Sequence, residues 1–88
     1  DDVGSWQAVS RLHPADEFGN AVVGSHVNVD SSGCIIHGNP GHTIATIDVH
    51  DLIVVQTADA TLVAPKTSEE RVREVVAALQ ASGSEDRI

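Results

Sequence analysis

The sequence is poor in the residues that anchor most small domains. It contains one Trp, one Phe and neither Tyr nor Met, so Val, Ile, Leu and Ala must fill the core. Its single cysteine, Cys34, excludes an intramolecular disulfide, and we expect it to be a buried small hydrophobe and not a nucleophile. A chain of 88 residues buries roughly 60 to 65% of its unfolded surface, which is enough for one core only.

Basic residues are also scarce. Lys and Arg number 5 against 13 Asp and Glu, which gives a formal net charge of −8. Nucleic acids and anionic membranes are bound through clustered Lys and Arg, so we expect neither as a partner. No apolar run of about 18 residues is present. The chain begins with Asp-Asp, without Met and without the basic flank of a signal peptide, which favours a cytoplasmic fragment of a longer protein.

The most informative stretch lies between residues 51 and 66. Leu52 to Val55 is an unbroken aliphatic run, which predicts a strand covered on both faces at the centre of the core. Thr57 to Asp59 has turn chemistry, and Ala60 to Ala64 predicts a second strand that Pro65 ends by withholding a backbone donor. The local unit is therefore two tightly joined strands.

Short apolar runs separated by Gly, Asp, Asn and Pro predict further strands. With the two above, the predicted strands are Ala21 to Val23, His26 to Asp30, Cys34 to His37, Thr43 to Asp48, Leu52 to Gln56 and Ala60 to Ala64. The turn-rich segment Gly38 to Gly41 predicts a loop between two of them. The polar segment Ala15 to Asn20 is the candidate domain boundary.

A six-residue apolar track runs through these strands, and Gly41 interrupts it. Its members are Val23, Val29, Ile35, Ile47 and Ile53. Such a repeat is typical of a stacked parallel β-helix. Ordinary alternating strands also score on this track, because six is a multiple of two. From the residues alone, a β-helix and a β-meander or small sandwich both stay open.

Helices are predicted at both ends of the chain. Ser5 to Leu12 has helical spacing, with Trp6 as a buried anchor and His13-Pro14 as its end. Thr67 to Glu70 matches a capping box, and the apolar residues that follow it at helical spacing, the helix stripe, are Val72, Val75, Val76 and Leu79. Gly83 ends this second helix. Because the stripe is too apolar to remain in water, we expect it to lie on the strands or on a partner, and we expect self-association.

Two segments resemble the bacterial mannose-1-phosphate guanylyltransferases, the enzymes that make GDP-mannose. Residues 51–66, Asp-Leu-Ile-Val-Val-Gln-Thr-Ala-Asp-Ala-Thr-Leu-Val-Ala-Pro-Lys, resemble the C-terminal region of that family, and residues 1–6 resemble the Asp-Val-Gly-Ser-Trp segment that closes its catalytic domain. The resemblance implies a mainly β fold, a short left-handed β-helix-like stack of small strands followed by a C-terminal α-helix. It divides the chain into the end of the catalytic domain (1–14), a β-helix-like domain (15–66), the helix (67–83) and a disordered tail (84–88).

The resemblance also implies a role. The chain would be the C-terminal assembly and bracing segment of an enzyme that converts GTP and mannose 1-phosphate to GDP-mannose and pyrophosphate, and Asp2 would help to hold Mg²⁺ in the intact enzyme. The Gly-rich nucleotide loop of that family is absent from this sequence. We therefore expect no catalytic residue and no activity in the chain alone, substrate binding through the missing catalytic domain, and a homo-oligomer.

Other candidate residues give weaker signals. The histidines, His13, His26, His37, His42 and His50, include no His-x-His pair and no cysteine at metal-finger spacing, so we expect surface or strand-end roles. For Lys66 we favour an exposed position at a strand end. The alternatives are an ion pair with Asp59 and a role beside a phosphate site in a neighbouring domain. A stand-alone acidic β module that binds a protein or a carbohydrate is the alternative function, and the Asp-Val-Gly-Ser-Trp segment argues against it.

Overall fold

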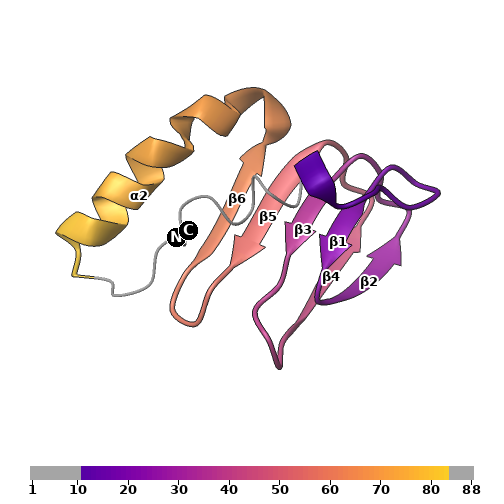
Figure 1. Ribbon diagram of the computed structural model, residues 1–88, viewed down its shortest axis with the longest axis horizontal. Coiled ribbons are helices and arrows are strands. Elements are labelled where there is room, and N and C mark those ends of the chain that lie inside the picture. The colour runs from indigo at the N-terminus through magenta and orange to yellow at the C-terminus, as the bar shows by residue number, and fades with distance from the viewer. Residues whose placement is uncertain (1–10, 84–88) are drawn as a thin grey trace.

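The computed structural model describes residues 11–83, which form six strands and a C-terminal helix (Figure 1). The elements are β1 (Ala21–Val23), β2 (Ser25–Val29), β3 (Ile35–His37), β4 (Thr43–Ile47), β5 (Leu52–Gln56), β6 (Thr61–Pro65), the 3₁₀ helix η2 (Lys66–Arg71) and α2 (Val72–Ala81). Each predicted strand is present, with bounds that differ by at most one residue. Asp2, Trp6 and the predicted tail lie outside the described residues, so these expectations stay predictions.

The strands stack as successive coils of one winding chain. β1, β3 and β5 pair in parallel in one sheet, and β2 and β4 pair in parallel in a second sheet. Ser25 pairs with Thr43 and Ile35 pairs with Ile53, an offset of 18 residues in both sheets. One coil is therefore three six-residue units. Parallel pairing in both sheets excludes a meander, and the predicted β-helix is confirmed.

The coils differ at one corner. In the first coil Gly24 alone joins β1 to β2, whereas in the second coil residues 38–42 join β3 to β4. As a result Ala21 pairs with Ile35 at an offset of 14 residues, although the neighbouring sheet keeps its offset of 18. The His42 N–H donates to the Asn39 carbonyl at 3.1 Å inside the longer corner. The predicted loop is confirmed, and it explains why Gly41 interrupts the six-residue track.

The first sheet is buried on both faces. Ile36 and Val54 point into the stack with Cys34, and form its inner core. Ile53 and Val55 point the other way and pack with residues of α2, in a second cluster. The unbroken aliphatic run in β5 follows from this double burial, as predicted, and β5 lies inside the sheet between β3 and β6. Cys34 is 1% exposed, which confirms it as a buried hydrophobe.

The predicted capping box is wrong. Residues 66–71 form a 3₁₀ helix whose N-cap is Pro65 and which has no side-chain capping hydrogen bond, so Thr67 does not cap a helix. Ser68 has φ −106° and ψ 18°, which breaks helical geometry, and α2 starts only at Val72. The physical reason is tertiary: η2 contacts both β5 and β6, because the chain must turn tightly from the last strand back over the sheet. Gly83 has φ 88° and ends the helix as expected.

The helix stripe is largely covered by the chain's own sheet. Val72 and Val76 are buried in the outer cluster, and Leu79 packs partly against it. Only Val75 is exposed, at 36%. The stripe therefore lies on the strands, one of the two predicted outcomes, and it does not by itself demand a partner.

The second sheet, β2 and β4, is half-buried on one face and exposed on the other. Alternate residues of both strands are half-buried and exposed. The half-buried residues are His26, Asn28, Ile44 and Thr46, and among the exposed residues are Val27, Val29, Ala45 and Ile47. Ile44 packs on the inner core, which identifies the half-buried set as the inward one. Apart from Ile44, the inward residues of this sheet are polar, and most of its outward residues are aliphatic.

Candidate functional site

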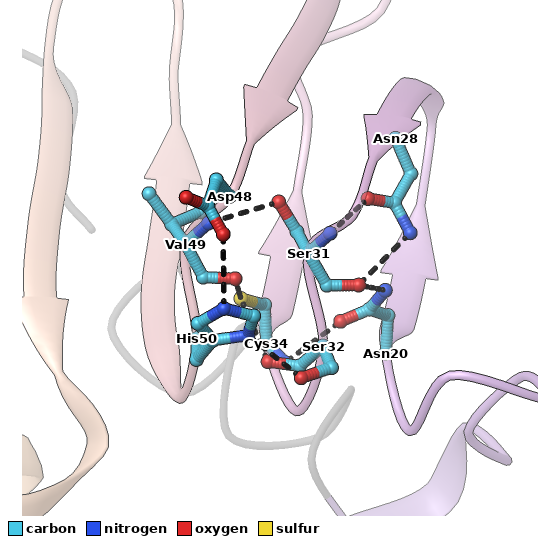
Figure 2. Close-up of polar contacts among 8 residues, drawn as sticks. All are labelled: Asn20, Asn28, Ser31, Ser32, Cys34, Asp48, Val49 and His50. Atoms are coloured by element: carbon cyan, nitrogen blue, oxygen red, sulfur yellow. Dashed lines mark hydrogen bonds and ion pairs between the residues drawn. The ribbon is translucent and has the colours of Figure 1, made fainter.

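Polar side chains gather on the third face of the stack, which joins β2 to β3 and β4 to β5 (Figure 2). Ser32 and His50 form a parallel bridge between successive coils. The Ser32 N–H donates to the Val49 carbonyl at 3.1 Å, and the Asp51 N–H donates to the Ser32 carbonyl at 3.0 Å. These backbone bonds continue the ladder of the two sheets, so the side chains of this face are held in a fixed order.

Residues with positive φ, in the left-handed backbone conformation, form the corners on both sides of this face. Asp30 and Asp48 occupy equivalent corners of successive coils, with φ of 59° and 52°. Gly33 and Asp51 occupy the next pair of corners, with φ of 70° and 56°. Asp tolerates this region better than most residues because its short side chain can bond locally. At Gly33 a Cβ would run into the Asp51 carboxylate, so a larger residue at this left-handed corner would require the Asp51 side chain to move.

A buried amide network closes the start of the stack. Asn20 is 1% exposed; its Nδ2 donates to the Ser31 carbonyl at 3.1 Å, and its Oδ1 accepts from the Cys34 N–H at 2.9 Å. Asn28 bonds both backbone groups of Ser31: its Oδ1 accepts from the Ser31 N–H at 2.8 Å, and its Nδ2 donates to the Ser31 carbonyl at 3.0 Å. The Ser31 hydroxyl accepts from the Val49 N–H at 3.3 Å, which links the two coils. The network satisfies backbone groups that no strand can pair there.

A serine, a histidine and an aspartate meet beside this network. The Ser32 Oγ lies 2.8 Å from His50 Nδ1, and His50 Nε2 lies 3.5 Å from Asp48 Oδ1. The order resembles a nucleophilic triad. However, the side chains of His50 and Asp48 are 51% and 82% exposed, so water screens the pair and the imidazole is not held in a dry pocket. The Ser32–His50 contact fastens successive coils to each other, whereas His50 and Asp48 lie on the same coil. The three side chains do not support acyl-transfer chemistry.

The other histidines hold separate positions. His26 Nε2 lies 2.9 Å from Thr46 Oγ1, across the inward face of the second sheet. His37 Nδ1 is buried and lacks a hydrogen-bond partner among residues 11–83. Within the same residues, no group of three or more His, Cys, Asp or Glu is arranged to hold a metal ion. No helix of the described part is long and apolar enough to cross a membrane.

Charged side chains near α2 form one tight pair. Arg71 Nε donates to Glu74 Oε2 at 2.8 Å, and this hydrogen bond, with the charge of the guanidinium, lowers the pKa of the Glu74 carboxyl. Lys66 makes no ion pair with any residue in 11–83, and Asp59 instead accepts from the Thr57 hydroxyl at 3.4 Å. Within one chain, the Lys66–Asp59 pair therefore does not form.

Sequence reasoning missed the amide network of Asn20, Asn28 and Ser31. Comparing residues 18 positions apart would have located the face on which this network lies, because Ser32 and His50 pair across it at that offset. The six-residue track considered apolar residues only, so it gave no information on the polar residues at the corners.

The family of the chain follows from its sequence match over this fold. Residues 24–79 match the model of the mannose-phosphate isomerase/GMP-like β-helix domain. The chain belongs to that family. The match starts at the corner after β1 and ends inside α2, so the GMP-like β-helix domain includes the stack, η2 and most of the last helix.

Relatives of this GMP-like β-helix domain are named as a biosynthesis protein and as guanylyltransferases. The alginate biosynthesis protein AlgA of Pseudomonas aeruginosa is 39% identical over 82 residues, which are 93% of this chain and 17% of that protein. The mannose-1-phosphate guanylyltransferase of Salmonella montevideo is 32% identical over 87 residues, 99% of this chain and 18% of that protein. The chain thus spans about a sixth of the length of such relatives.

A solved structure gives the same result. The mannose-1-phosphate geranyltransferase of Thermus thermophilus is 38% identical, with a TM-score of 0.69 over 91% of this chain and 24% of that one. The resemblance to mannose-1-phosphate guanylyltransferases is thus supported by the family match and by relatives of that name, and a solved mannose-1-phosphate transferase shares the fold.

Proposed function

We propose that the chain is the C-terminal assembly and bracing module of a mannose-1-phosphate guanylyltransferase. The parent enzyme would convert GTP and mannose 1-phosphate to GDP-mannose and pyrophosphate in the cytoplasm, with Mg²⁺ offsetting charge at the phosphates. The observation that carries the proposal is the nearly end-to-end match of this domain to enzymes of that name. In this proposal the chain contributes no catalytic group except Asp2, which would ligate the metal in the intact enzyme.

The outer face of the second sheet supports the bracing role. Its exposed aliphatic residues Val27, Val29 and Ile47 are 54%, 45% and 68% exposed, and no charged residue lies in β2 or β4. Such a face is unusual in a chain with a net charge of −8, and contiguous apolar surface marks an interaction site. Phe18 and Val29 line one pocket, so Phe18 lies beside the end of this face.

The area of this face helps to identify its partner. A stable dimer between separate chains buries roughly 800 Å² on each side, which two five-residue strands do not provide. A domain on the same polypeptide needs less area, because the linker keeps its effective concentration high. We therefore assign this face to the catalytic part of the parent, of which about five sixths lies outside this chain.

The activity is tested on the intact parent. It should form GDP-mannose from GTP and mannose 1-phosphate, measured by anion-exchange chromatography, whereas the 88-residue chain alone should form none. Asp2→Asn should lower the rate by orders of magnitude, with partial recovery at high Mg²⁺, and the neighbouring Asp1→Asn should have little effect. A parent that forms no GDP-mannose, or turnover by the purified chain alone, contradicts the proposal.

The bracing contact is tested separately. Ile47→Asp in the parent should lower its thermal unfolding temperature by several degrees, because it places a charge in the contact with the catalytic domain. His42→Asp, in the exposed corner 38–42, adds the same charge outside that face and should leave the unfolding temperature unchanged. Equal effects of the two substitutions would remove the second sheet from the contact.

A further inference from the structure

A pocket opens at the start of the stack, beside the buried amide network. Its volume of about 440 Å³ lies in the range of small-molecule sites. The residues that line it are Phe18, Asn28, Val29, Asp30, Ser31 and Ser32. An aromatic ring thus lies beside several hydrogen-bonding side chains, a combination that is typical of a ligand site.

The aromatic ring of this pocket is not used in the core. Phe18 is the only Phe, Trp or Tyr among residues 11–83, and neither hydrophobic cluster of these residues includes it. It is 55% exposed. Aromatic side chains have the largest apolar area to bury, so a fold that is poor in them gains most by burying the one it has. The exposed position of Phe18 therefore indicates a role other than folding.

The backbone around Phe18 is held in place. Asp16 Oδ1 accepts from the Phe18 N–H at 2.9 Å and from the Asn20 N–H at 3.0 Å. The Gly33 N–H donates to the Phe18 carbonyl at 3.1 Å, so both backbone groups of Phe18 are bonded. A ligand that packs on this ring does not have to order the turn first, which lowers the entropy cost of binding.

Two lining residues have oxygen atoms that can accept further hydrogen bonds. The Asp30 carboxylate forms no hydrogen bond or ion pair with residues 11–83. The Ser32 hydroxyl lies 2.8 Å from His50 Nδ1, and His50 Nε2 faces the Asp48 carboxylate (Figure 2). Because that carboxylate favours the proton on Nε2 of the neutral imidazole, Nδ1 accepts and the Ser32 hydroxyl donates to it. The lone pairs of Ser32 Oγ are then free to accept from a ligand.

A third lining residue, Asn28, has a proton to donate. Its Nδ2 carries two protons, and one of them is donated to the Ser31 carbonyl at 3.0 Å. The other has no acceptor among residues 11–83. The lining residues therefore have both donors and acceptors in excess of what the fold uses.

This set of groups favours a neutral sugar. A pyranose has an apolar C–H face for an aromatic ring, and its hydroxyls both donate and accept. An anionic ligand is disfavoured by the Asp30 carboxylate and by the net charge of −8. A cation would use only Asp30 and the ring, and such contacts are weak at an exposed site because water screens them.

We infer that this pocket binds one uncharged pyranose unit. Phe18 stacks on the C–H face of the sugar, Asp30 and Ser32 accept hydrogen bonds from its hydroxyls, and Asn28 donates to one of them. The site goes beyond the proposed function and does not depend on it, because all of its residues belong to this chain. The pyranose has two possible sources, a free monosaccharide and the end of a glycan.

The first test titrates the 88-residue chain with methyl α-D-mannopyranoside and with mannotetraose, followed by heteronuclear NMR. A ligand of one sugar ring in a single open site should bind with a Kd of about 1 mM. The amide signals that shift should be those of the pocket, including Phe18, Asp30 and Ser32. Tighter binding of mannotetraose would assign the site to a glycan end, and equal affinity would assign it to the free sugar.

The second test uses substitutions in the pocket. Phe18→Ala should weaken binding about tenfold, whereas Phe18→Tyr keeps the ring and should bind as the wild type does. Asp30→Asn should also weaken binding, and Asn tolerates the φ of 59° at this corner. Asp59→Asn removes the same charge from an exposed turn outside the pocket and should have no effect. Far-UV circular dichroism checks each fold, and if Phe18→Ala unfolds, the Asp30 and Asp59 pair decides.

The outcomes that overturn the inference are specific. They are the absence of shifts in the pocket with both sugars, wild-type affinity in folded Phe18→Ala, and equal losses of affinity in Asp30→Asn and Asp59→Asn. Binding of mannose 1-phosphate as tight as that of the neutral mannoside would overturn the charge argument. Binding of N-acetylarginine amide in place of the sugars would make the pocket a receptor for a basic side chain. None of these results alters GDP-mannose formation by the parent, so the two proposals fail separately.

Discussion

The two sheets of the stack are built from the same coils, yet they are opposite in character. In the first sheet Ile36 and Val54 fill the interior, and Ile53 is covered on the outside by α2. In the second sheet half-buried His26 and Asn28 point inward, and the outward aliphatic residues are exposed. A β-helix coil fixes which residues alternate, but it does not decide which face is covered. That depends on what packs against each sheet, and only the first sheet has its cover within residues 11–83.

The largest expected effect comes from the doubly buried sheet. Ile53→Ala should lower the free energy of unfolding by about 3 kcal/mol, because Ile53 is fully buried between β5 and α2. Ile44→Ala, in the half-buried inward set of the second sheet, should cost about half as much. Urea unfolding followed by circular dichroism measures both. Equal losses of unfolding free energy would mean that Ile53 and Ile44 are packed equally well in their two sheets.

An intermediate effect is expected from the amide network. Asn20→Ala should cost about 2 kcal/mol, since it leaves the buried Cys34 N–H and one bond of the Ser31 carbonyl unpaired. Asn28→Ala should cost less, because Asn28 is only half-buried and water replaces part of its bonding. The same unfolding measurement applies. If Asn28→Ala is the more costly of the two, the closure of the stack depends on the second sheet and not on Asn20.

The smallest expected effect is that of a substitution on the exposed face of the second sheet, and it tests most directly whether that face is covered. Ile47→Thr should change the stability of the 88-residue chain by less than about 0.5 kcal/mol, because its side chain is 68% exposed and Thr keeps the β-branched shape. In the intact parent the same substitution should destabilise measurably, if the catalytic domain covers this face. A loss of stability in the 88-residue chain alone would show that another part of this chain already covers Ile47.

Much of the fold could be predicted from local pattern. The unbroken run Leu52 to Val55 correctly predicted double burial, and the six-residue track correctly predicted stacking, since Ile35 lies in register with Ile53. The same track could not tell inside from outside. Val29 and Ile47 lie on it and are in register, yet both are exposed. An even-numbered repeat keeps residues aligned between coils, whereas burial depends on a partner surface that the repeat does not encode.

The parts that sequence reasoning got wrong depend on tertiary contacts. Thr67 had the sequence of a helix cap, but the turn from β6 back over the sheet favours a 3₁₀ helix there. The Ser32–His50 contact joins residues far apart in sequence, and only the completed register of the coils brings them together. The proposed role of Asp2 stays a prediction, because it lies outside the described residues and involves a domain outside this chain.

The unequal corners of the two coils have a practical consequence. Residues 38–42 do in the second coil what Gly24 alone does in the first, and the strands on either side still pair in register. The extra residues of the second corner thus extend into solvent and leave the pairing of the strands intact. Lengthening an exposed loop costs only about 0.6 kcal/mol for each doubling. The exposed segment from Pro40 to His42 is therefore a suitable point to insert a peptide tag or a spectroscopic label, where it would report on the module and leave its stack unchanged.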